Sequence, residues 1–287
     1  MKLIKDKFYE GERPLYASSK LRLENVKFYP GESALKESSG IEAVNCTFMC
    51  KYPFWHNQNA LIEKCDFTMY SRAAIWYSKN IKMINSLVDA PKMFRELEGL
   101  YVKNVKFTDA AETCWNCSDI EFYDVEARNG DYIFMHSRNI IIDGFRLQGN
   151  YSFQDARNVE IRNAVMDSKD AFWNTEDVTV FDSVISGEYL GWHSKNLRLV
   201  NCKIGGTQPL CYASNLILEN CEFMDDCDLA FEYSTVKAEV TNHIVSVKNP
   251  LEGTIRAQSI GQIIIDNNAR NTEACKILVD NKVNQSI

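Results

Sequence analysis

The chain contains 287 residues, of which 45% are hydrophobic and 25% charged, and its net charge is −7. This composition is ordinary for a folded protein and excludes a mostly disordered chain. The mild acidity argues against a nucleic-acid-binding surface, which normally carries a basic patch. No apolar run approaches the ~18 residues of a membrane-spanning helix. We therefore expect neither nucleic acid nor a membrane as a partner.

The first seven residues, MKLIKDK, contain no apolar core of a secretory signal, which predicts a cytoplasmic protein. The ten cysteines should then be reduced thiols rather than a disulfide framework. Cys114 and Cys117 have a redox-like spacing, but they lie inside a repeat and not in a βαβ unit. A zinc site would need a second Cys or His pair at ligand spacing, which the sequence lacks, and we expect no metal and no cofactor.

An eight-residue phrase returns along the chain every 19 to 21 residues, and examples are LRLENVKF, IEAVNCTF, LRLVNCKI and LILENCEF. Its fifth position, the first-turn position, is held mostly by Asn, Asp or Gly. The members are Asn25, Asn45, Lys64, Asn85, Asn104, Asp124, Gly144, Asn163, Asp182, Asn201 and Asn220. Five residues earlier is a second-turn position, held by Lys20, Gly40, Asn59, Asn80, Gly99, Asp119, Asn139, Asn158, Asp177, Asn196 and Asn215. Since these residue types tolerate a left-handed backbone, the pattern predicts two tight turns per repeat.

Between the turns the apolar residues alternate with polar ones, as in Leu197, Leu199, Cys202 and Ile204. This period of two predicts strands, and no window sustains a comparable helical stripe. Each repeat reads as strand, first turn, short strand, loop, third strand and second turn. The sequence therefore predicts an all-β fold, a single-stranded right-handed parallel β-helix of about 12 rungs.

A leucine-rich repeat is the alternative fold, because its period and its Asn/Cys position are similar. Here only Glu24 separates Leu23 from Asn25, one residue fewer than that motif requires, so the β-helix is favoured. We expect one domain over residues 1–287. Residues 1–12 should cap one end, residues 13–235 should form regular rungs, and residues 236–287 should form irregular final rungs and a C-terminal cap.

The repeated turn phrase resembles that of the pectate-lyase-like superfamily of right-handed β-helices, from Asn25 to Asn220. More closely, the chain resembles a bacterial domain-of-unknown-function family within that superfamily. The resemblance implies the fold and, by analogy, binding or processing of a polysaccharide. It implies no catalytic residue, since the Asp-Asp and Gly-His motifs of polygalacturonases are absent from the sequence.

Three residues before each second-turn position is a column of polar side chains, the polar column. It runs Glu37, His56, Tyr77, Glu96, Asn116, His136, Asp155, Asn174, His193, Tyr212 and Glu232. Burying such charges unpaired costs several kcal/mol each, so we expect the polar column to face solvent. Either it is a solvated face only, or it carries a site. In the second case His136 and Asp155 on neighbouring rungs pair as a base and its orienting carboxylate, and His193 is a third catalytic candidate.

One position earlier is the indole column, which holds all five tryptophans of the chain: Trp55, Trp76, Trp115, Trp173 and Trp192. The position before that is also apolar and rich in phenylalanine, and a regular strand cannot turn both inward. The indoles form either a core ladder or, if they face outward, a platform for sugar rings. We favour buried phenylalanines and partly exposed tryptophans.

These patterns predict an oligosaccharide bound or processed on the outer face, with Trp173, Trp192, Asn174, Tyr212 and Glu232 as contacts. An enzyme of this kind would be a carbohydrate-active hydrolase, lyase or isomerase. The alternative function is a non-catalytic scaffold for protein interaction or self-association, with a second copy of the chain as its partner.

Overall fold

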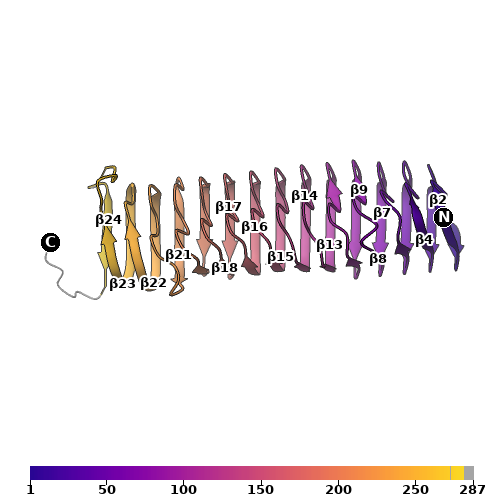
Figure 1. Ribbon diagram of the computed structural model, residues 1–287. Coiled ribbons are helices and arrows are strands. Elements are labelled where there is room, and N and C mark those ends of the chain that lie inside the picture. Colours follow the sequence, from indigo (N-terminus) through magenta and orange to yellow (C-terminus); the bar gives the residue numbers. More distant parts are fainter. Residues whose placement is uncertain (272, 281–287) are drawn as a thin grey trace. The chain divides into compact units, whose positions relative to one another are not determined.

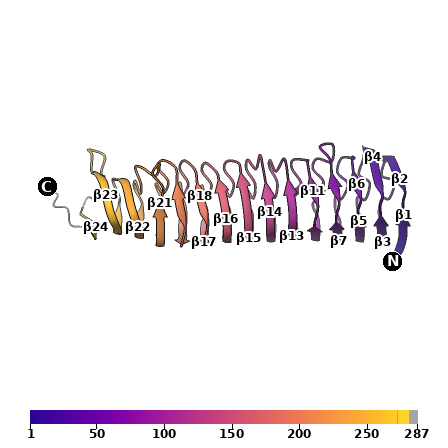
Figure 2. The same ribbon diagram turned by 90° about the horizontal axis from the view of Figure 1, so that it is seen from below.

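The computed structural model describes residues 1–271 and 273–280, and among these residues every regular element is a β-strand. The chain divides into two compact units, unit 1 (Met1–Gly149) and unit 2 (Asn150–Ile287). In each unit successive coils of backbone lie side by side, as Figures 1 and 2 show. The described residues contain no helix that could span a membrane.

Unit 1 contains strands that pair in parallel with the equivalent strands of the next coil. They are β1 (Lys2–Lys5), β2 (Phe8–Glu12), β3 (Ser19–Glu24), β4 (Lys27–Glu32), β5 (Ser39–Val44), β6 (Thr47–Phe48), β7 (Gln58–Glu63), β8 (Asp66–Phe67), β9 (Ile75–Trp76), β10 (Lys79–Ile84), β11 (Leu87–Val88), β12 (Phe94–Arg95), β13 (Glu98–Phe107), β14 (Ser118–Ala127) and β15 (Arg138–Gln148).

Unit 2 repeats the arrangement and ends with two long strands and a short one. Its strands are β16 (Arg157–Asp167), β17 (Glu176–Phe181), β18 (Val184–Ser186), β19 (Lys195–Val200), β20 (Lys203–Gly205), β21 (Leu216–Phe223), β22 (Thr235–Lys248), β23 (Glu252–Ile264) and β24 (Cys275–Val279).

The register of the coils follows the repeat of the sequence. Leu21 of β3 pairs with Ile41 of β5, and Leu197 of β19 lies opposite Val178 of β17. Because equivalent residues stack, an inward apolar position becomes a continuous buried file. The predicted β-helix is therefore confirmed.

The turns are left-handed at every position where the sequence predicts it. First-turn residues such as Asn25 and Asn201 have φ of 53°, and second-turn residues such as Asn196 have φ of 57°. In unit 2 the first-turn side chains bond to one another: Asn220 Nδ2 donates to Asn201 Oδ1 (2.9 Å), and Asn201 Nδ2 donates to Asp182 Oδ1 (2.9 Å). These bonds satisfy amide groups that a tight turn would otherwise leave to solvent.

Residues 1–271 and 273–280 form more coils than expected, about 15 turns instead of about 12. At the N-terminus β1 pairs in register with β3, so the first residues form a coil of their own. Beyond residue 235, β22 and β23 extend the same parallel stack. In the first coil Asp6 holds the first-turn position with φ of 52° and accepts a hydrogen bond from Asn25 Nδ2 at 2.9 Å, whereas the coils beyond residue 235 lack the Asn-turn phrase. Counting the phrase from Asn25 to Asn220 alone therefore underestimates the coils.

Lys64 interrupts a file of first-turn asparagines in unit 1. On one side Asn45 Nδ2 donates to Asn25 Oδ1, and on the other Asn104 Nδ2 donates to Asn85 Oδ1 at 2.7 Å. Lys64 itself has φ of 53°, a conformation that suits asparagine better than lysine.

We expect Lys64→Asn to raise the free energy of unfolding by about 1 kcal/mol, because it joins the two halves of the file and relieves the backbone. Urea unfolding followed by circular dichroism measures the change. Lys27→Asn, a substitution at an outward strand position of β4, is the matched control and should give no gain. Equal stability of Lys64→Asn and the natural chain would contradict this prediction.

Candidate functional site

The indole column is half-exposed, as predicted. All five tryptophans have intermediate exposure, while the preceding phenylalanines, such as Phe54 and Phe172, are completely buried. The short side of each coil therefore turns the phenylalanines into the core and lays the indoles along the surface.

In unit 1 the faces of the indoles cover one another. The rings of Trp55 and Trp76 are stacked at 5.4 Å with 9° between their planes. The guanidinium of Arg95 lies 4.3 Å from the ring centroid of Trp76 and 4.4 Å from that of Trp115. Trp55 Nε1 donates to the backbone oxygen of Ala73 at 2.6 Å. These contacts leave no free indole face between the stacked neighbours, so this part of the column is a structural ladder of stacking and cation–π contacts.

Tyrosines flank the indoles in both units, since Trp55 also contacts Tyr52 at 4.7 Å and Tyr77 at 5.6 Å, but among the described residues of unit 2 no indole is stacked on another. Trp173 contacts the ring of Tyr151 at 5.9 Å, whereas Trp192 contacts Tyr189 at 4.7 Å and Tyr212 at 5.0 Å. The rings of two tyrosines outside the indole column thus flank Trp192, and their hydroxyl groups add hydrogen-bonding capacity to the aromatic surface.

The polar residues of the polar column occupy left-handed backbone positions, which the sequence analysis did not predict for this column. Its members Asp155, Asn174, His193 and Tyr212 all have φ between 53° and 58°. The N–H of Asp155 donates to Trp173 O at 3.0 Å. In the same way, the N–H of Asn174 donates to Trp192 O in the next coil at 2.9 Å. Asn, Asp and His are favoured at such left-handed positions, which explains part of the column's polarity.

The polar column also faces solvent. Asn174 and His193 are exposed in unit 2, and the same column in unit 1 lines a shallow groove of about 380 Å³ through Tyr77, Glu96 and Asn116. Solvent access is the condition that a site on this column requires.

Unit 2 brings several predicted site residues together in one continuous surface, which we call the polar-aromatic face (Asp155, Trp173, Asn174, Trp192, His193 and Tyr212). Asn174 Nδ2 donates to Asp155 Oδ1. The rings of His193 and Tyr212 are 5.2 Å apart. Burial raises the pKa of Tyr212, and the nearby Glu232 carboxylate adds to the effect.

The predicted catalytic residues are distributed over both units. His136 belongs to unit 1, whereas Asp155 and His193 belong to unit 2 and are separated by the coil of Asn174. The pairing of His136 with Asp155 stays a prediction.

The column position predicted for Glu232 is wrong. Tyr233, with φ of 53°, takes the left-handed position after Tyr212, and Glu232 lies in the indole column. Val236 pairs with Leu216, so the corner after Tyr233 is one residue shorter than the others. The side chain of Glu232 is only 11% exposed and forms an ion pair with Lys248 at 2.9 Å.

Asp170 is a buried carboxyl that the sequence reasoning missed. The residue is 7% exposed, and within the described residues its side chain has neither a hydrogen bond nor an ion pair. Burial raises its pKa to about 6; the positive charge of Lys169 acts in the opposite direction and Glu188 reinforces the rise. The sequence offered one signal for Asp170. It lies three residues before Trp173, just as Tyr189 lies three residues before Trp192.

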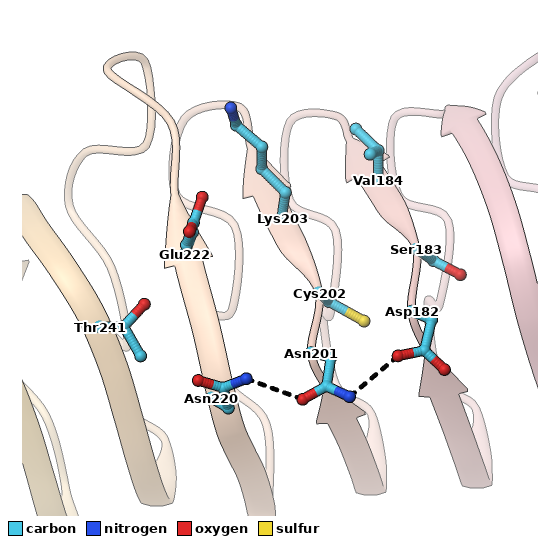
Figure 3. Close-up of a pocket in the computed structure, with 9 residues that line it drawn as sticks. All are labelled: Asp182, Ser183, Val184, Asn201, Cys202, Lys203, Asn220, Glu222 and Thr241. Atoms are coloured by element: carbon cyan, nitrogen blue, oxygen red, sulfur yellow. Dashed lines mark hydrogen bonds between the residues drawn. The ribbon is translucent and has the colours of Figure 1, made fainter.

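A separate groove of about 380 Å³ follows the first-turn side chains of unit 2. Figure 3 shows Lys203 and Glu222 projecting from neighbouring strands above the bonded amides of Asn201 and Asn220. It contains none of the predicted site residues, and its amides already bond to one another.

Metal and thiol chemistry have little support in the described residues. Groups of three or more His, Cys, Asp or Glu side chains that could hold a metal ion are absent from this part of the chain. Burial raises the pKa of Cys117 to about 12 and moves that of Cys114 in the same direction, so these thiols are poor nucleophiles.

The parallel coils and left-handed turns define a protein of the right-handed β-helix class. The chain belongs to the family described as protein of unknown function (DUF3737), whose family model matches residues 2–278. This agrees with the family resemblance seen in the sequence. No curated protein matches the chain.

Three solved structures illustrate the likeness to other proteins. The surface adhesin PfbA of Streptococcus pneumoniae has 10% identity and a TM-score of 0.38, over 93% of this chain and 85% of that chain. The tailspike protein of E. coli bacteriophage HK620, solved with a pentasaccharide, has 9% identity and a TM-score of 0.36, over 97% and 70%. The mannuronan C-5 epimerase AlgE4 A-module of Azotobacter vinelandii has 11% identity and a TM-score of 0.30, over 97% and 90%. The fold assignment above rests on the strand pairing of this chain.

Proposed function

We propose that unit 2 binds an oligosaccharide along the polar-aromatic face. A sugar ring presents an apolar C–H face together with a rim of hydroxyl groups, so its recognition needs aromatic rings beside hydrogen-bonding side chains. The observation that carries the proposal is the position of Tyr212, whose ring contacts both His193 of the polar column (5.2 Å) and Trp192 of the indole column (5.0 Å). The two columns thereby form one surface.

The periodicity of the coils supports a chain-like ligand. Neighbouring strands lie ~4.8 Å apart, so each coil repeats the same set of groups at a short interval. Asn174, His193 and Tyr212 offer an amide, an imidazole and a phenol on three successive coils. An extended glycan can place one sugar after another along this row.

Binding is favoured over turnover by the contacts within unit 2. The Asp155 carboxylate accepts a hydrogen bond from Asn174, and the coil of Asn174 separates it from His193. Processing of the ligand by His136, Asp155 and His193 stays a prediction, and so does self-association of the chain.

The test is a titration of tryptophan fluorescence with cellotetraose, the N-acetylglucosamine tetramer and tetragalacturonate. We expect a saturable change with at least one of them, and at least ~10-fold weaker binding by Trp192→Ala and His193→Ala, about 1.4 kcal/mol. Trp55→Ala is the control, since this indole is covered by its neighbour in unit 1.

Circular dichroism establishes that each variant keeps the fold, and the exposed His193 is the variant least able to disturb it. The proposal is wrong if no oligosaccharide of the panel binds, or if Trp192→Ala and His193→Ala bind as tightly as the natural chain.

A further inference from the structure

Asp170 lies beside the polar-aromatic face and is only 7% exposed. Its carboxylate oxygens keep some contact with solvent, and among the described residues they have no hydrogen bond and no ion pair. Removing a carboxylate from water costs several kcal/mol unless a cation or hydrogen-bond donors compensate it. Polar groups left in this condition are rare in proteins and often belong to functional sites.

Unit 1 contains the equivalent carboxyl in a compensated form. Glu112 lies three residues before Trp115, as Asp170 lies three residues before Trp173. The Glu112 carboxylate accepts a bond from Arg95 Nη2 at 3.2 Å and forms an ion pair with Lys92 Nζ at 2.9 Å. The guanidinium of Arg95 also lies over the ring of Trp115.

The backbone register identifies what replaces these cations in unit 2. The N–H of Lys92 donates to Ala111 O, the residue before Glu112, and the N–H of Tyr151 donates in the same way to Lys169 O, the residue before Asp170; both bonds are 2.8 Å long. Tyr151 therefore occupies the position of Lys92. Three residues further on, Gln154 occupies the position of Arg95. Both positive charges have been exchanged for neutral side chains, while the acid and the tryptophan are kept.

The other charges around Asp170 do not supply the missing cation. Lys169 forms its ion pair with Glu188 at 2.9 Å, and its Nζ lies 5.4 Å from the ring centroid of Tyr189. Lys169 and Glu188 cancel each other, so the site keeps a net negative charge. Tyr151 and Tyr189 in the adjoining coils have phenol side chains and supply no positive charge.

We infer that Asp170 with Tyr151 and Trp173 forms a cation-recognition site, and that its ligand is a positively charged amino sugar of the oligosaccharide. The ligand ammonium group would take the place that Lys92 and Arg95 fill in unit 1, against a carboxylate and an aromatic face. The inference rests on the proposed function, because the neighbouring Asn174 and His193 supply the groups for sugar hydroxyls.

The experiment compares two tetrasaccharides that differ in charge, the glucosamine tetramer and the N-acetylglucosamine tetramer, at pH 6.5. The variants are Asp170→Asn and, as the matched control, Glu112→Gln of unit 1. We expect the natural chain to bind the glucosamine tetramer at least ~10-fold more tightly than the acetylated one. Asp170→Asn should abolish this difference, and Glu112→Gln should keep it.

Asp170→Asn removes an uncompensated buried charge, so we expect it to fold, and circular dichroism and the melting temperature check this. Equal binding of both tetramers by the natural chain, or a preference that survives in Asp170→Asn, would overturn the inference and leave the proposed function standing. If neither tetramer nor any other oligosaccharide of the panel binds, both the inference and the proposed function are wrong. Tighter, Asp170-dependent binding of tetralysine than of either tetramer would overturn the assignment of an amino sugar.

Discussion

We expect Phe48→Ala to lower the free energy of unfolding by about 3–5 kcal/mol. Phe48 is completely buried, and its ring is stacked between Phe28 at 5.1 Å and Phe67 at 4.7 Å. The ring of Phe54 packs edge-on against it at 5.1 Å. Since the paired coils cannot close over the space, truncation loses the transfer free energy of the ring and leaves a cavity. Urea unfolding followed by circular dichroism measures the loss.

Phe8→Ala is the matched control for this prediction. Phe8 pairs with the outward Lys27 and is 67% exposed, so the same truncation removes little buried surface. We expect a change within about 0.5 kcal/mol. Similar losses in the two variants would show that the inward file of phenylalanines does not hold the coils together.

Gly206→Ala should destabilise the protein by about 3 kcal/mol or more. The residue has φ of +97°, and an added Cβ would lie 2.4 Å from the backbone oxygen of Gly187 in the preceding coil. The two coils are joined there by a bond from Gly187 N to Gly205 O at 3.2 Å. Relief of the clash therefore requires that neighbouring backbone segments separate. Thermal and urea unfolding measure the effect.

Gly40→Ala is the control, because it tests the left-handed conformation without the clash. Gly40 has φ of +61°, and the nearest atom to its added Cβ is Lys20 N at 3.6 Å. Lys20 and Asn59 occupy the same turn position in neighbouring coils with left-handed backbones of their own. We expect a loss of about 1 kcal/mol. A loss as large as that of Gly206→Ala would mean that coil contact contributes nothing at Gly206.

The outcome at the indole column shows where the sequence pattern stops being informative. Alternation could not decide between Phe172 and Trp173, because both are apolar and a strand period turns only one of them inward. The structure buries Phe172 and leaves Trp173 half-exposed. Whether an indole face is covered depends on how the side chains of the adjacent coils pack against it, as those of Trp76 and Arg95 do in unit 1.

Glu232 and Asp170 are two further residues whose surroundings the sequence pattern does not predict. A corner shortened by one residue moves Tyr233 into the position predicted for Glu232, and no local signal marks the change. Asp170 is unusual only by comparison with Glu112, whose cations Lys92 and Arg95 come from the preceding coil. A carboxylate and a cation that lie 17 to 20 residues apart in the sequence can be recognised as an ion pair only when the stacking of the coils is known.

The sequence by itself determined the first two strands and the two left-handed turns of each repeat and their parallel stacking, because these follow from local backbone preferences and a strict period. The predicted third strand is wrong for most repeats, since among the described residues it forms only as β9 and β12 and is replaced elsewhere by turns. Only the tertiary structure decided the number of coils, which indole faces are covered and which carboxyl has no cation. These properties depend on contacts between coils, where each side chain meets residues that the repeat brings near but does not specify.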